Sequence, residues 1–504
     1  QPKNLILEST VNPWVVSAQY AVRGEILLKA NALNEKLKSG EKLPFEKMVY
    51  CNIGNPQALL QKPMSFNREV ISLVTNPPLL AKALADDGSL RAAFAPDALE
   101  RASTYLKRIP EGVGAYSTSQ GYIMVREEVA EFISKRDGYP ASPQNIFLSD
   151  GASGSVKLIM NILIRSGLGT DGILVPIPQY PLYSALAALA NGTLVGYYLD
   201  EESGWGMRAG ELERAIENAE KDGVSVRALV VINPGNPTGQ CFSSETMQEL
   251  IMFCTRRGLM LLADEVYQEN VYGANPFISF KKMVMDMAHG KVGALRAEDR
   301  AAVGAMQLVS FHSVSKGFLG ECGVRGGYME IMNIDEGVRA QILKLASISL
   351  CPNTVGQISV GLMVNPPAPG SPSHTSWKAE RDAIMDSLRR RASVLHTFLN
   401  SLESVTCAPL DGALYAFPKV VLPPAAIAAA EAAGKTPDTF YCLALLEATG
   451  IVVVPGTGFK QVPGTFHFRT TFLPPEEDMA TVQRLLAGFH RDFMAKYKDA
   501  KTEL

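Results

Sequence analysis

The chain has 504 residues, of which 47% are hydrophobic, and its formal net charge is -3 at pH 7. This length exceeds what one hydrophobic core usually fills, so we expect two packed domains or one elaborated domain. The nearly balanced charge argues against a nucleic-acid partner. No apolar run is long enough to span a membrane, so we expect no membrane partner either.

The seven cysteines are scattered along the chain and form no Cys-x-x-Cys pair. This pattern indicates neither a metal site nor a disulfide framework, and it favours a reducing compartment. The sequence does not begin with Met and shows no signal-peptide pattern. We therefore expect a cytoplasmic protein, or a mitochondrial one if a presequence has been removed.

The first 45 residues predict an irregular start and then one amphipathic helix over residues 14–37. Its apolar positions include Val16, Tyr20, Ile26, Leu27 and Leu33. A short strand follows and ends in a Gly-Asn-Pro turn. Gly54 in this turn allows the backbone to approach a ligand closely.

Residues 66–135 have a mainly helical pattern that is interrupted at 111–121. The two glycines in this interruption do not make a dinucleotide-binding fingerprint, because no strand precedes them. We therefore predict a loop here, with Tyr116 presented on it.

Residues 145–330 predict repeated strand–turn–helix units, which is the signature of a mostly parallel sheet covered by helices. The predicted strands are 146–148, 173–175, 228–232, 259–262 and 306–311. The fold class is therefore α/β.

Polar side chains follow the carboxyl ends of five predicted strands: Ser153, Tyr180, Asn236, Asp264, Tyr267 and Lys316. Ligands bind outside the carboxyl ends of the strands in an open α/β sheet. A single acid at a strand end is more often a helix cap or part of an ion pair. Several polar strand ends together predict one site.

The turn at 149–154 consists of small residues and leads into a helix, so free N–H groups near Ala152 and Ser153 are available to a phosphate. Lys316 lies between serines and glycines after a buried strand. A lysine in an arbitrary Ser-x-x-Lys sequence is usually solvated, but a desolvated amine loses its proton more readily, as Schiff-base chemistry requires.

After residue 365 a Pro/Gly/Ser-rich stretch predicts a surface connection. A charged helix is expected at 378–402, a strand at 412–420, an alanine-rich helix at 425–433, and further strands at 451–454 and 465–471. Arg469 lies in the last of these strands, and its guanidinium group suits a substrate carboxylate.

These side chains fit an aldehyde cofactor that carries a phosphate and a pyridine ring. Lys316 would form the imine, Asp264 would keep the ring nitrogen protonated, and Tyr180 would stack on the ring. Asn236 and Tyr267 would hydrogen-bond the phenolic oxygen of the ring. The phosphate ligands would be Ala152, Ser153, Ser313 and Arg325.

Four segments carry a family resemblance: NPGNPTGQ at 233–240, LLADEVYQENVY at 261–272, SFHSVSKGFLGECGVRGGYME at 310–330 and VVPGTGFKQVPGTFHFRTTFLPP at 453–475. They resemble the fold-type-I pyridoxal-phosphate aminotransferases, and more closely the eukaryotic alanine aminotransferase family. The resemblance extends over nearly the whole chain, and the GECGVRGGYME segment is far more specific than the short Ser-x-x-Lys pattern. The segment 281–305 does not match the family, and we interpret it as a surface insertion.

The resemblance implies a three-layer architecture, with a large domain on a mixed, mostly parallel sheet and a smaller α/β domain. The implied divisions are an N-terminal arm and helix at 1–45, a discontinuous small domain at 46–100 and 366–504, and a large pyridoxal-phosphate-binding domain at 101–365. It also implies a homodimer with shared active sites, in which Tyr116 reaches the phosphate of the neighbouring subunit.

The implied activity is reversible amino transfer from L-alanine to 2-oxoglutarate by a ping-pong Schiff-base mechanism, with pyridoxal 5'-phosphate as the cofactor. The implied catalytic residues are Lys316, Asp264 and Tyr267, and Gly54, Asn236 and Arg469 would contact the substrate. Glutamate– or alanine–glyoxylate transamination and a pyridoxal-phosphate lyase remain alternatives. A non-catalytic regulator ranks below them, because the first 45 residues are too short and insufficiently basic for a DNA-binding domain.

Overall fold

The computed structural model describes residues 10–18, 24–86, 88–274 and 276–498. Two short helices stand where one was predicted: α1 (Pro13–Ser17) and α2 (Glu25–Lys38). The backbone is extended at Ala18, after α1, and again at Gly24, before α2. The prediction of one continuous helix is therefore wrong at these two residues. Glycine is a poor helix former, which accounts for the boundary at Gly24. The predicted apolar position Tyr20 lies outside the described residues.

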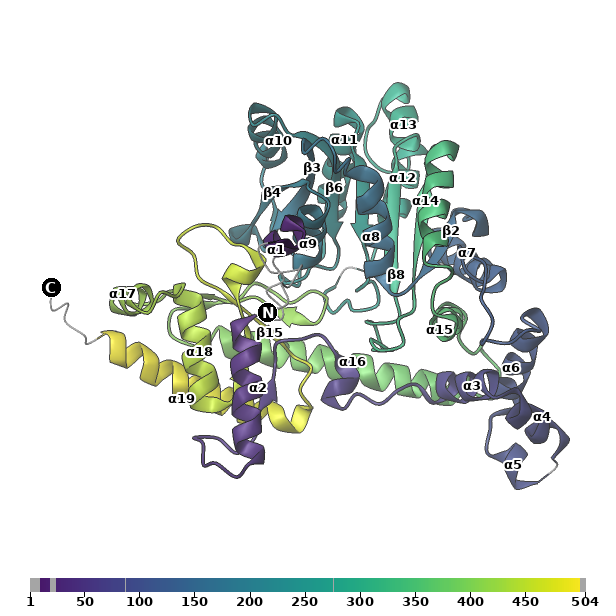
Figure 1. Ribbon diagram of the computed structural model, residues 1–504, viewed down its shortest axis with the longest axis horizontal. Coiled ribbons are helices and arrows are strands. Elements are labelled where there is room, and N and C mark those ends of the chain that lie inside the picture. The colour runs from purple at the N-terminus through teal and green to yellow at the C-terminus, as the bar shows by residue number, and fades with distance from the viewer. Residues whose placement is uncertain (1–9, 19–23, 87, 275, 499–504) are drawn as a thin grey trace, which may run out of the picture.

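An eight-stranded sheet forms the centre of the upper part of the molecule in Figure 1. Its spatial order is β2 (Ile146–Ser149), β9 (Gly327–Met332), β8 (Leu308–Ser313), β7 (Met260–Asp264), β6 (Ser225–Ile232), β3 (Asp171–Ile177), β4 (Thr193–Asp200) and β5 (Gly206–Met207). The pairs from β8 through β7, β6 and β3 to β4 are parallel, whereas β2–β9, β9–β8 and β4–β5 are antiparallel. The predicted mixed, mostly parallel sheet is confirmed.

Alternate residues of the central strands face two different hydrophobic cores, as expected for a sheet that is buried on both faces. In β6, Leu229 and Val231 belong to one core, and Ala228, Val230 and Ile232 belong to the other. The first core is covered by α10 (Glu211–Lys221), α11 (Ser244–Arg257), α12 (Phe280–Ala288) and α13 (Ala297–Gly304). The second is covered by α8 (Ala152–Leu163), α9 (Pro181–Leu189) and α14 (Glu336–Ile348). These helices complete the three layers.

Residues 281–305 are not a surface insertion, so that interpretation was wrong. The helix α12 buries Phe280, Met283, Val284 and Met287 in the core beside the sheet, and α13 adds Val303. Methionines and aliphatic residues at helical spacing indicate a helix with a buried face, but the charged residues between them obscure this pattern in the sequence.

A helical region lies beside the β2–β9 edge of the sheet, at the right of Figure 1. It comprises α3 (Ser65–Thr75), α4 (Pro77–Ala85), α5 (Ser89–Ala92), α6 (Pro96–Arg108), α7 (Ile123–Asp137) and α15 (Thr354–Val364). Helices α3, α4, α6, α7 and α15 share one hydrophobic core. The non-helical stretch between α6 and α7 confirms the predicted loop that carries Tyr116.

A further core joins α2 to the C-terminal part of the chain. Its helices are α16 (His374–Leu399), α17 (Pro424–Ala432), α18 (Pro437–Thr449) and α19 (Glu476–Lys498). Its short strands are β1 (Val49–Tyr50), β10 (Val405–Thr406), β11 (Tyr415–Ala416), β12 (Lys419–Val420), β13 (Ile451–Val452) and β15 (Phe468–Thr471). The strand β14 (Val454–Pro455) pairs with β15 but buries Val454 in the first core of the sheet. The strand β1 pairs in parallel with β13, so the two ends of the chain build this part together.

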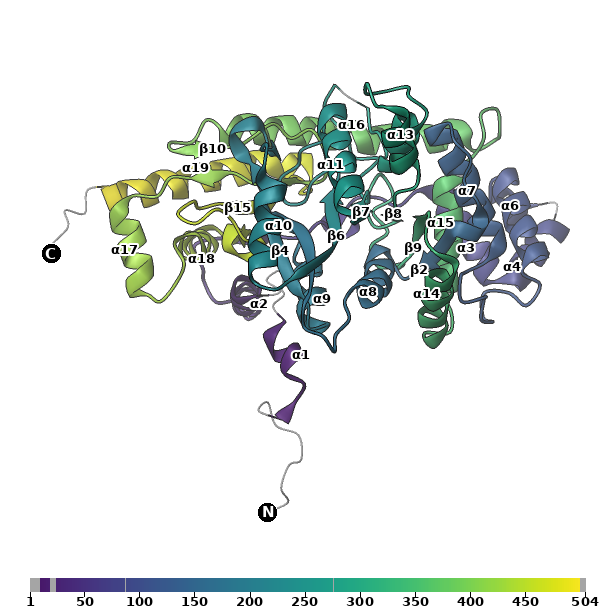
Figure 2. The ribbon, with the colours of Figure 1, turned by 90° about the horizontal axis from the view of Figure 1, so that it is seen from above.

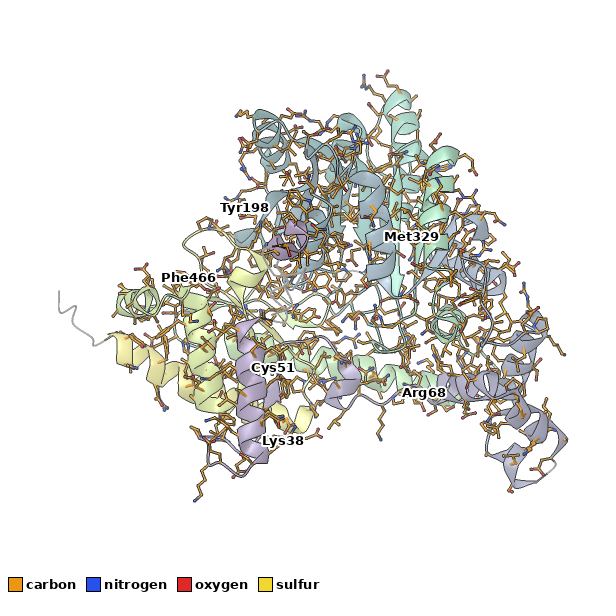
Figure 3. All side chains as sticks on the ribbon, viewed as in Figure 1. Lys38, Cys51, Arg68, Tyr198, Met329 and Phe466 are labelled. Carbon is orange, nitrogen blue, oxygen red and sulfur yellow. The ribbon has the colours of Figure 1, made fainter. Side chains whose placement is uncertain are left out.

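The long helix α16 runs horizontally below the sheet in Figure 1, and Figure 2 shows α1 projecting from the body beside α9. In Figure 3, Met329 marks the sheet in the upper half of the view and Cys51 marks the core of the joined chain ends in the lower half. The domain boundaries stay a prediction. None of the described helices is both long and apolar enough to cross a membrane.

Candidate active site

A cavity of about 240 Å³ opens at the carboxyl ends of the parallel strands. Nearly all the predicted site residues line it: Gly54, Ala152, Ser153, Tyr180, Asn236, Asp264, Tyr267, Ser313, Lys316, Arg325 and Arg469. The exception is Tyr116, whose side chain is 77% exposed and does not line the cavity. A larger cavity of about 530 Å³ lies between α16 and residues 56–65, and it contains none of the predicted residues.

Lys316 follows the carboxyl end of β8 and points toward the segment that carries Gly54. Its Nζ donates a hydrogen bond of 2.5 Å to the Gly54 carbonyl oxygen. The next residue is fixed as well, because the Gly317 N–H donates to Asn270 Oδ1 at 2.8 Å. The amine is therefore held at the point where the sheet meets the core of the joined chain ends.

Asp264 is the last residue of β7 and is 5% exposed. Tyr183 donates a hydrogen bond of 3.0 Å to its Oδ2, and the Val266 N–H donates to Oδ1 at 3.4 Å. Burial raises the pKa of Asp264 to about 6, although both hydrogen bonds and the charge of Lys316 act in the opposite direction. A buried carboxylate with a raised pKa gains most from a cationic partner.

The small-residue turn after β2 leads into α8 with Gly151 at a φ of 73°. No side chain caps this helix, so the N–H groups of its first turn are available to an anion. Arg325 closes the turn, because its Nη2 donates to the Asp150 carbonyl oxygen at 2.9 Å and to Ser153 Oγ at 3.1 Å. Gly327 packs so closely that a β-carbon there would lie 2.6 Å from the Gly151 carbonyl carbon.

Arg469 is 2% exposed, and no described carboxylate forms an ion pair with it. Its Nη1 donates to Asn236 Oδ1 at 3.1 Å, its Nη2 donates to the Asn52 carbonyl oxygen at 2.5 Å, and its Nε has no partner among the described residues. The guanidinium carbon lies 4.3 Å from the ring centroid of Tyr415 and 4.6 Å from that of Phe459. A buried cation without an acid partner can bind an anion.

Two cavity tyrosines contact each other. Tyr267 donates a hydrogen bond of 3.3 Å to the Tyr415 hydroxyl group. Burial and the neighbouring Tyr415 raise the pKa of Tyr267 well above its usual value. For Tyr415, burial also acts to raise the pKa, but the charges of Lys316 and Arg469 prevail and lower it.

Sequence reasoning missed Tyr415 and Tyr183. Tyr415 lies on the two-residue strand β11, within the segment DGALYAFPK at 411–419. Tyr183 lies at the start of α9, three residues after Tyr180. Residues three apart share a helix face, and this spacing was the available signal for Tyr183.

The comparisons with known proteins agree with this fold and this cavity. The model of the family "Aminotransferase class I and II" matches residues 86–487. The chain belongs to the class I and II aminotransferases, and it is a pyridoxal-phosphate-dependent enzyme.

Two relatives are close to the chain over nearly its full length. The probable mitochondrial alanine aminotransferase of Dictyostelium discoideum is 52% identical, with 96% of this chain and 88% of that protein covered. Glutamate–glyoxylate aminotransferase 2 of Arabidopsis thaliana is 49% identical, with 97% of each covered. Among solved structures, alanine aminotransferase from Pyrococcus furiosus superposes with a TM-score of 0.73 at 23% identity, covering 96% of this chain and all of that one.

The cavity fits pyridoxal 5'-phosphate on features of this chain alone. The uncapped start of α8 and the side chains of Ser153 and Arg325 form an anion site at one end. Asp264 lies on the floor with a pKa that burial raises, and Lys316 supplies an amine. No group of three or more His, Cys, Asp or Glu side chains is arranged for a metal ion anywhere in the part of the chain that is described.

Proposed function

We propose that this chain is an alanine aminotransferase, which transfers the amino group of L-alanine to 2-oxoglutarate and yields pyruvate and L-glutamate reversibly. The observation that carries the proposal is the cavity in which Lys316, Asp264 and Arg469 meet, where Arg469 forms no ion pair with any described residue. The name of the Dictyostelium relative supports the choice of alanine.

When bound, the cofactor supplies an aldehyde that captures amines and a ring that stabilises the electron pair left on the substrate α-carbon. Asp264 would hold the proton of the ring nitrogen, and Tyr183 orients Asp264 through its hydrogen bond. Tyr180 would cover one face of the ring. Asn236 and Tyr267 would donate hydrogen bonds to the phenolic oxygen.

The phosphate end of the cofactor would lie at the start of α8. The Ala152 N–H and the hydroxyl groups of Ser153 and Ser313 would donate hydrogen bonds to it, and Arg325 would add a charge. Arg325 has a φ of 58°, a left-handed conformation that is costly for a residue with a side chain. Such strained positions gather at functional sites, which supports this role.

Arg469 would bind the α-carboxylate of every substrate through its planar guanidinium group. Asn236 already contacts Nη1 and would share the carboxylate, and the backbone at Gly54 would border the substrate. Lys316 Nζ would remove the proton from the substrate α-carbon and keep it inside the cavity for return. Since one product leaves before the second substrate enters the same cavity, the kinetics would be ping-pong.

We also propose that the protein is a homodimer whose subunits share active sites. The side chain of Tyr116 is exposed in its own chain. The loop that carries Tyr116 is hydrogen-bonded to a segment that contains two exposed apolar side chains, Ile348 and Leu350. Ser119 Oγ donates to the Leu350 carbonyl oxygen at 2.7 Å. The side chains of Ile348 and Leu350 are 75% and 54% exposed, as expected for a surface that a partner covers.

The same segment adjoins the phosphate turn. The Asn353 N–H donates to Asp150 Oδ1 at 2.7 Å, directly before Gly151. A subunit that covers Leu350 would therefore bring its own residues close to the phosphate end of the cavity. This contact supports the placement of the partner's Tyr116 at that phosphate.

The division into an N-terminal arm, a discontinuous small domain and a large cofactor-binding domain is likewise a proposal. The core that joins Ile26–Cys51 of the N-terminal part to residues after Leu388 supports a small domain made from both chain ends. The compartment that we propose is the cytoplasm. The mitochondrion is the alternative, because the name of the Dictyostelium relative includes that compartment.

A second candidate is glutamate–glyoxylate transamination, because the Arabidopsis relative with that name is almost as similar to this chain. A panel of amino donors (alanine, glutamate, aspartate, tyrosine and glycine) with 2-oxoglutarate, pyruvate and glyoxylate as acceptors tests the proposal. We expect kcat/KM to be highest for alanine with 2-oxoglutarate. A higher value for glyoxylate, aspartate or tyrosine would refute the substrate assignment, and an eliminated product in place of a 2-oxo acid would indicate a lyase.

A further inference from the structure

Tyr415 lies inside the cavity and has no part in the roles proposed so far. It belongs to β11, which pairs with β15 so that Tyr415 stands opposite Thr471, two residues after Arg469. The side chain is 3% exposed. Its position is therefore set by the same pair of strands that positions the proposed carboxylate clamp.

The ring of Tyr415 is one of two aromatic surfaces that hold the guanidinium group of Arg469. The guanidinium carbon lies 4.3 Å from the Tyr415 ring centroid and 4.6 Å from that of Phe459. Contacts of this kind stabilise a cation most when it is desolvated. Because no described acid pairs with Arg469, the two rings and two neutral oxygens determine the direction in which its free N–H groups point.

The hydroxyl group of Tyr415 lies where three other groups of the cavity meet. It accepts the hydrogen bond from Tyr267 at 3.3 Å. A β-carbon added to Gly54 would collide with this hydroxyl group and would lie 3.2 Å from Lys316 Nζ. The lowered pKa of Tyr415, which the charges of Lys316 and Arg469 produce against the effect of burial, agrees with this crowded, positively charged position.

We propose that Tyr415 is a positioning residue for transamination: its ring orients Arg469 toward the substrate carboxylate, and its hydroxyl group orders Tyr267 beside Lys316. When Tyr267 donates its one proton to the cofactor, the Tyr415 hydroxyl group would donate to the Tyr267 oxygen, which reverses the direction of their hydrogen bond. This inference rests on the proposed functions of these three residues. It assigns two separable effects to one side chain, one on substrate binding and one on proton transfer.

Two variants separate these effects. Tyr415→Phe keeps the ring, so KM for L-alanine and for 2-oxoglutarate should stay within about twofold of wild type, while loss of the hydroxyl group lowers kcat about fivefold. The alkaline limb of its kcat profile should move to higher pH, because a phenol no longer ionises beside Lys316. Tyr415→Leu also removes the ring, so both KM values should rise together by about tenfold.

The control is Tyr441→Phe. Tyr441 is buried in the same part of the molecule, its hydroxyl group contacts His490 3.0 Å away, and it does not line the cavity. Removal of that hydroxyl group should leave both KM values and the pH profile unchanged. Thermal unfolding of all three variants shows whether they fold. If Tyr415→Leu does not fold, Tyr415→Phe alone tests the proposed role of the hydroxyl group.

A measurement without cofactor or substrate provides a second readout. The ultraviolet difference titration between wild-type apoenzyme and Tyr415→Phe should show one phenol that ionises below the usual pKa of about 10. The proposal is overturned if Tyr415→Leu leaves both KM values unchanged, or if Tyr415→Phe alters neither the pH profile nor the titration. If Arg469→Lys also leaves both KM values unchanged, the proposed function of Arg469 is what fails.

Discussion

Replacement of Asp264 by Asn should stabilise the protein without cofactor, although it should impair the enzyme. Burial raises the pKa of Asp264 from 3.8 to about 6 in the folded protein. Since each tenfold change in a protonation equilibrium corresponds to 1.36 kcal/mol, the ionised Asp264 costs the folded state about 3 kcal/mol at neutral pH. An asparagine has nearly the same shape, can still accept a hydrogen bond through its Oδ1, and carries no such cost.

The sign of the pH dependence follows from the same two values. Between the unfolded pKa of 3.8 and the folded pKa of about 6, the folded protein binds the proton more tightly than the unfolded chain does. The wild-type apoenzyme therefore loses stability as the pH rises through this window, and the full loss is present above it. The gain in the free energy of unfolding from Asp264→Asn should therefore be small near pH 3.8 and largest above about pH 6.

The assay is urea unfolding of both apoenzymes at about pH 5 and about pH 8, with the free energies of unfolding compared as a difference at each pH. Burial raises the pKa of Glu265 to about 8, so Glu265 titrates in both proteins. Its contribution to the free energy of unfolding therefore largely cancels when the two proteins are compared. Asp492→Asn is the charge-matched control, because its side chain is 71% exposed. A difference between wild type and Asp264→Asn that does not grow with pH would refute the reasoning.

The cofactor should reverse the order of stability, because a protonated ring nitrogen gives the Asp264 carboxylate a cationic partner. Addition of pyridoxal 5'-phosphate should therefore raise Tm more in wild type than in Asp264→Asn. The variant should also have a lower kcat, with a smaller effect on cofactor binding than on turnover. If its turnover stays close to that of wild type, Asp264 does not have the role that we propose.

Three further predictions concern the other proposed roles. Lys316→Ala should fold normally but show no measurable transamination, and borohydride should attach the cofactor to Lys316 in wild type; attachment to another lysine would show that the assignment is wrong. Arg469→Lys should raise KM for alanine and glutamate alike by about tenfold or more, because lysine lacks the planar fork that both α-carboxylates require; a loss confined to one substrate would contradict a shared clamp. Mixing inactive Lys316→Ala chains with impaired Tyr116→Ala chains should restore activity, since one site of each heterodimer is intact; verified heterodimers without recovered activity would count against shared sites.

The sheet and most of the cavity could be predicted from the sequence because each strand end is a local signal. Asp264 directly follows one apolar run and Lys316 comes shortly after another, and parallel strands bring such ends to one edge of a sheet. The strands β7 and β8 begin and end one or two residues later than predicted, but both polar ends lie in the cavity all the same.

The missed residues depend on contacts between distant parts of the chain. Tyr415 enters the cavity only because β11 pairs with β15, and a two-residue strand gives almost no periodic signal. The sequence does not identify the group that would bind the second carboxylate of glutamate. Tyr183 lies in the first turn of α9, and its hydrogen bond to Asp264 joins two residues that are 81 positions apart in the sequence.

The pairing of β1 with β13 has a consequence for synthesis of the protein. The segment that carries Gly54 leaves the ribosome early, but its partner strand lies near the other end of the chain. The residues proposed to hold the cofactor, from Ala152 to Arg325, all emerge before Arg469 does. A nascent chain should therefore gain affinity for pyridoxal 5'-phosphate well before it gains affinity for amino acids. Stalled chains of increasing length, tested for cofactor capture and for carboxylate binding, should acquire the two properties in that order.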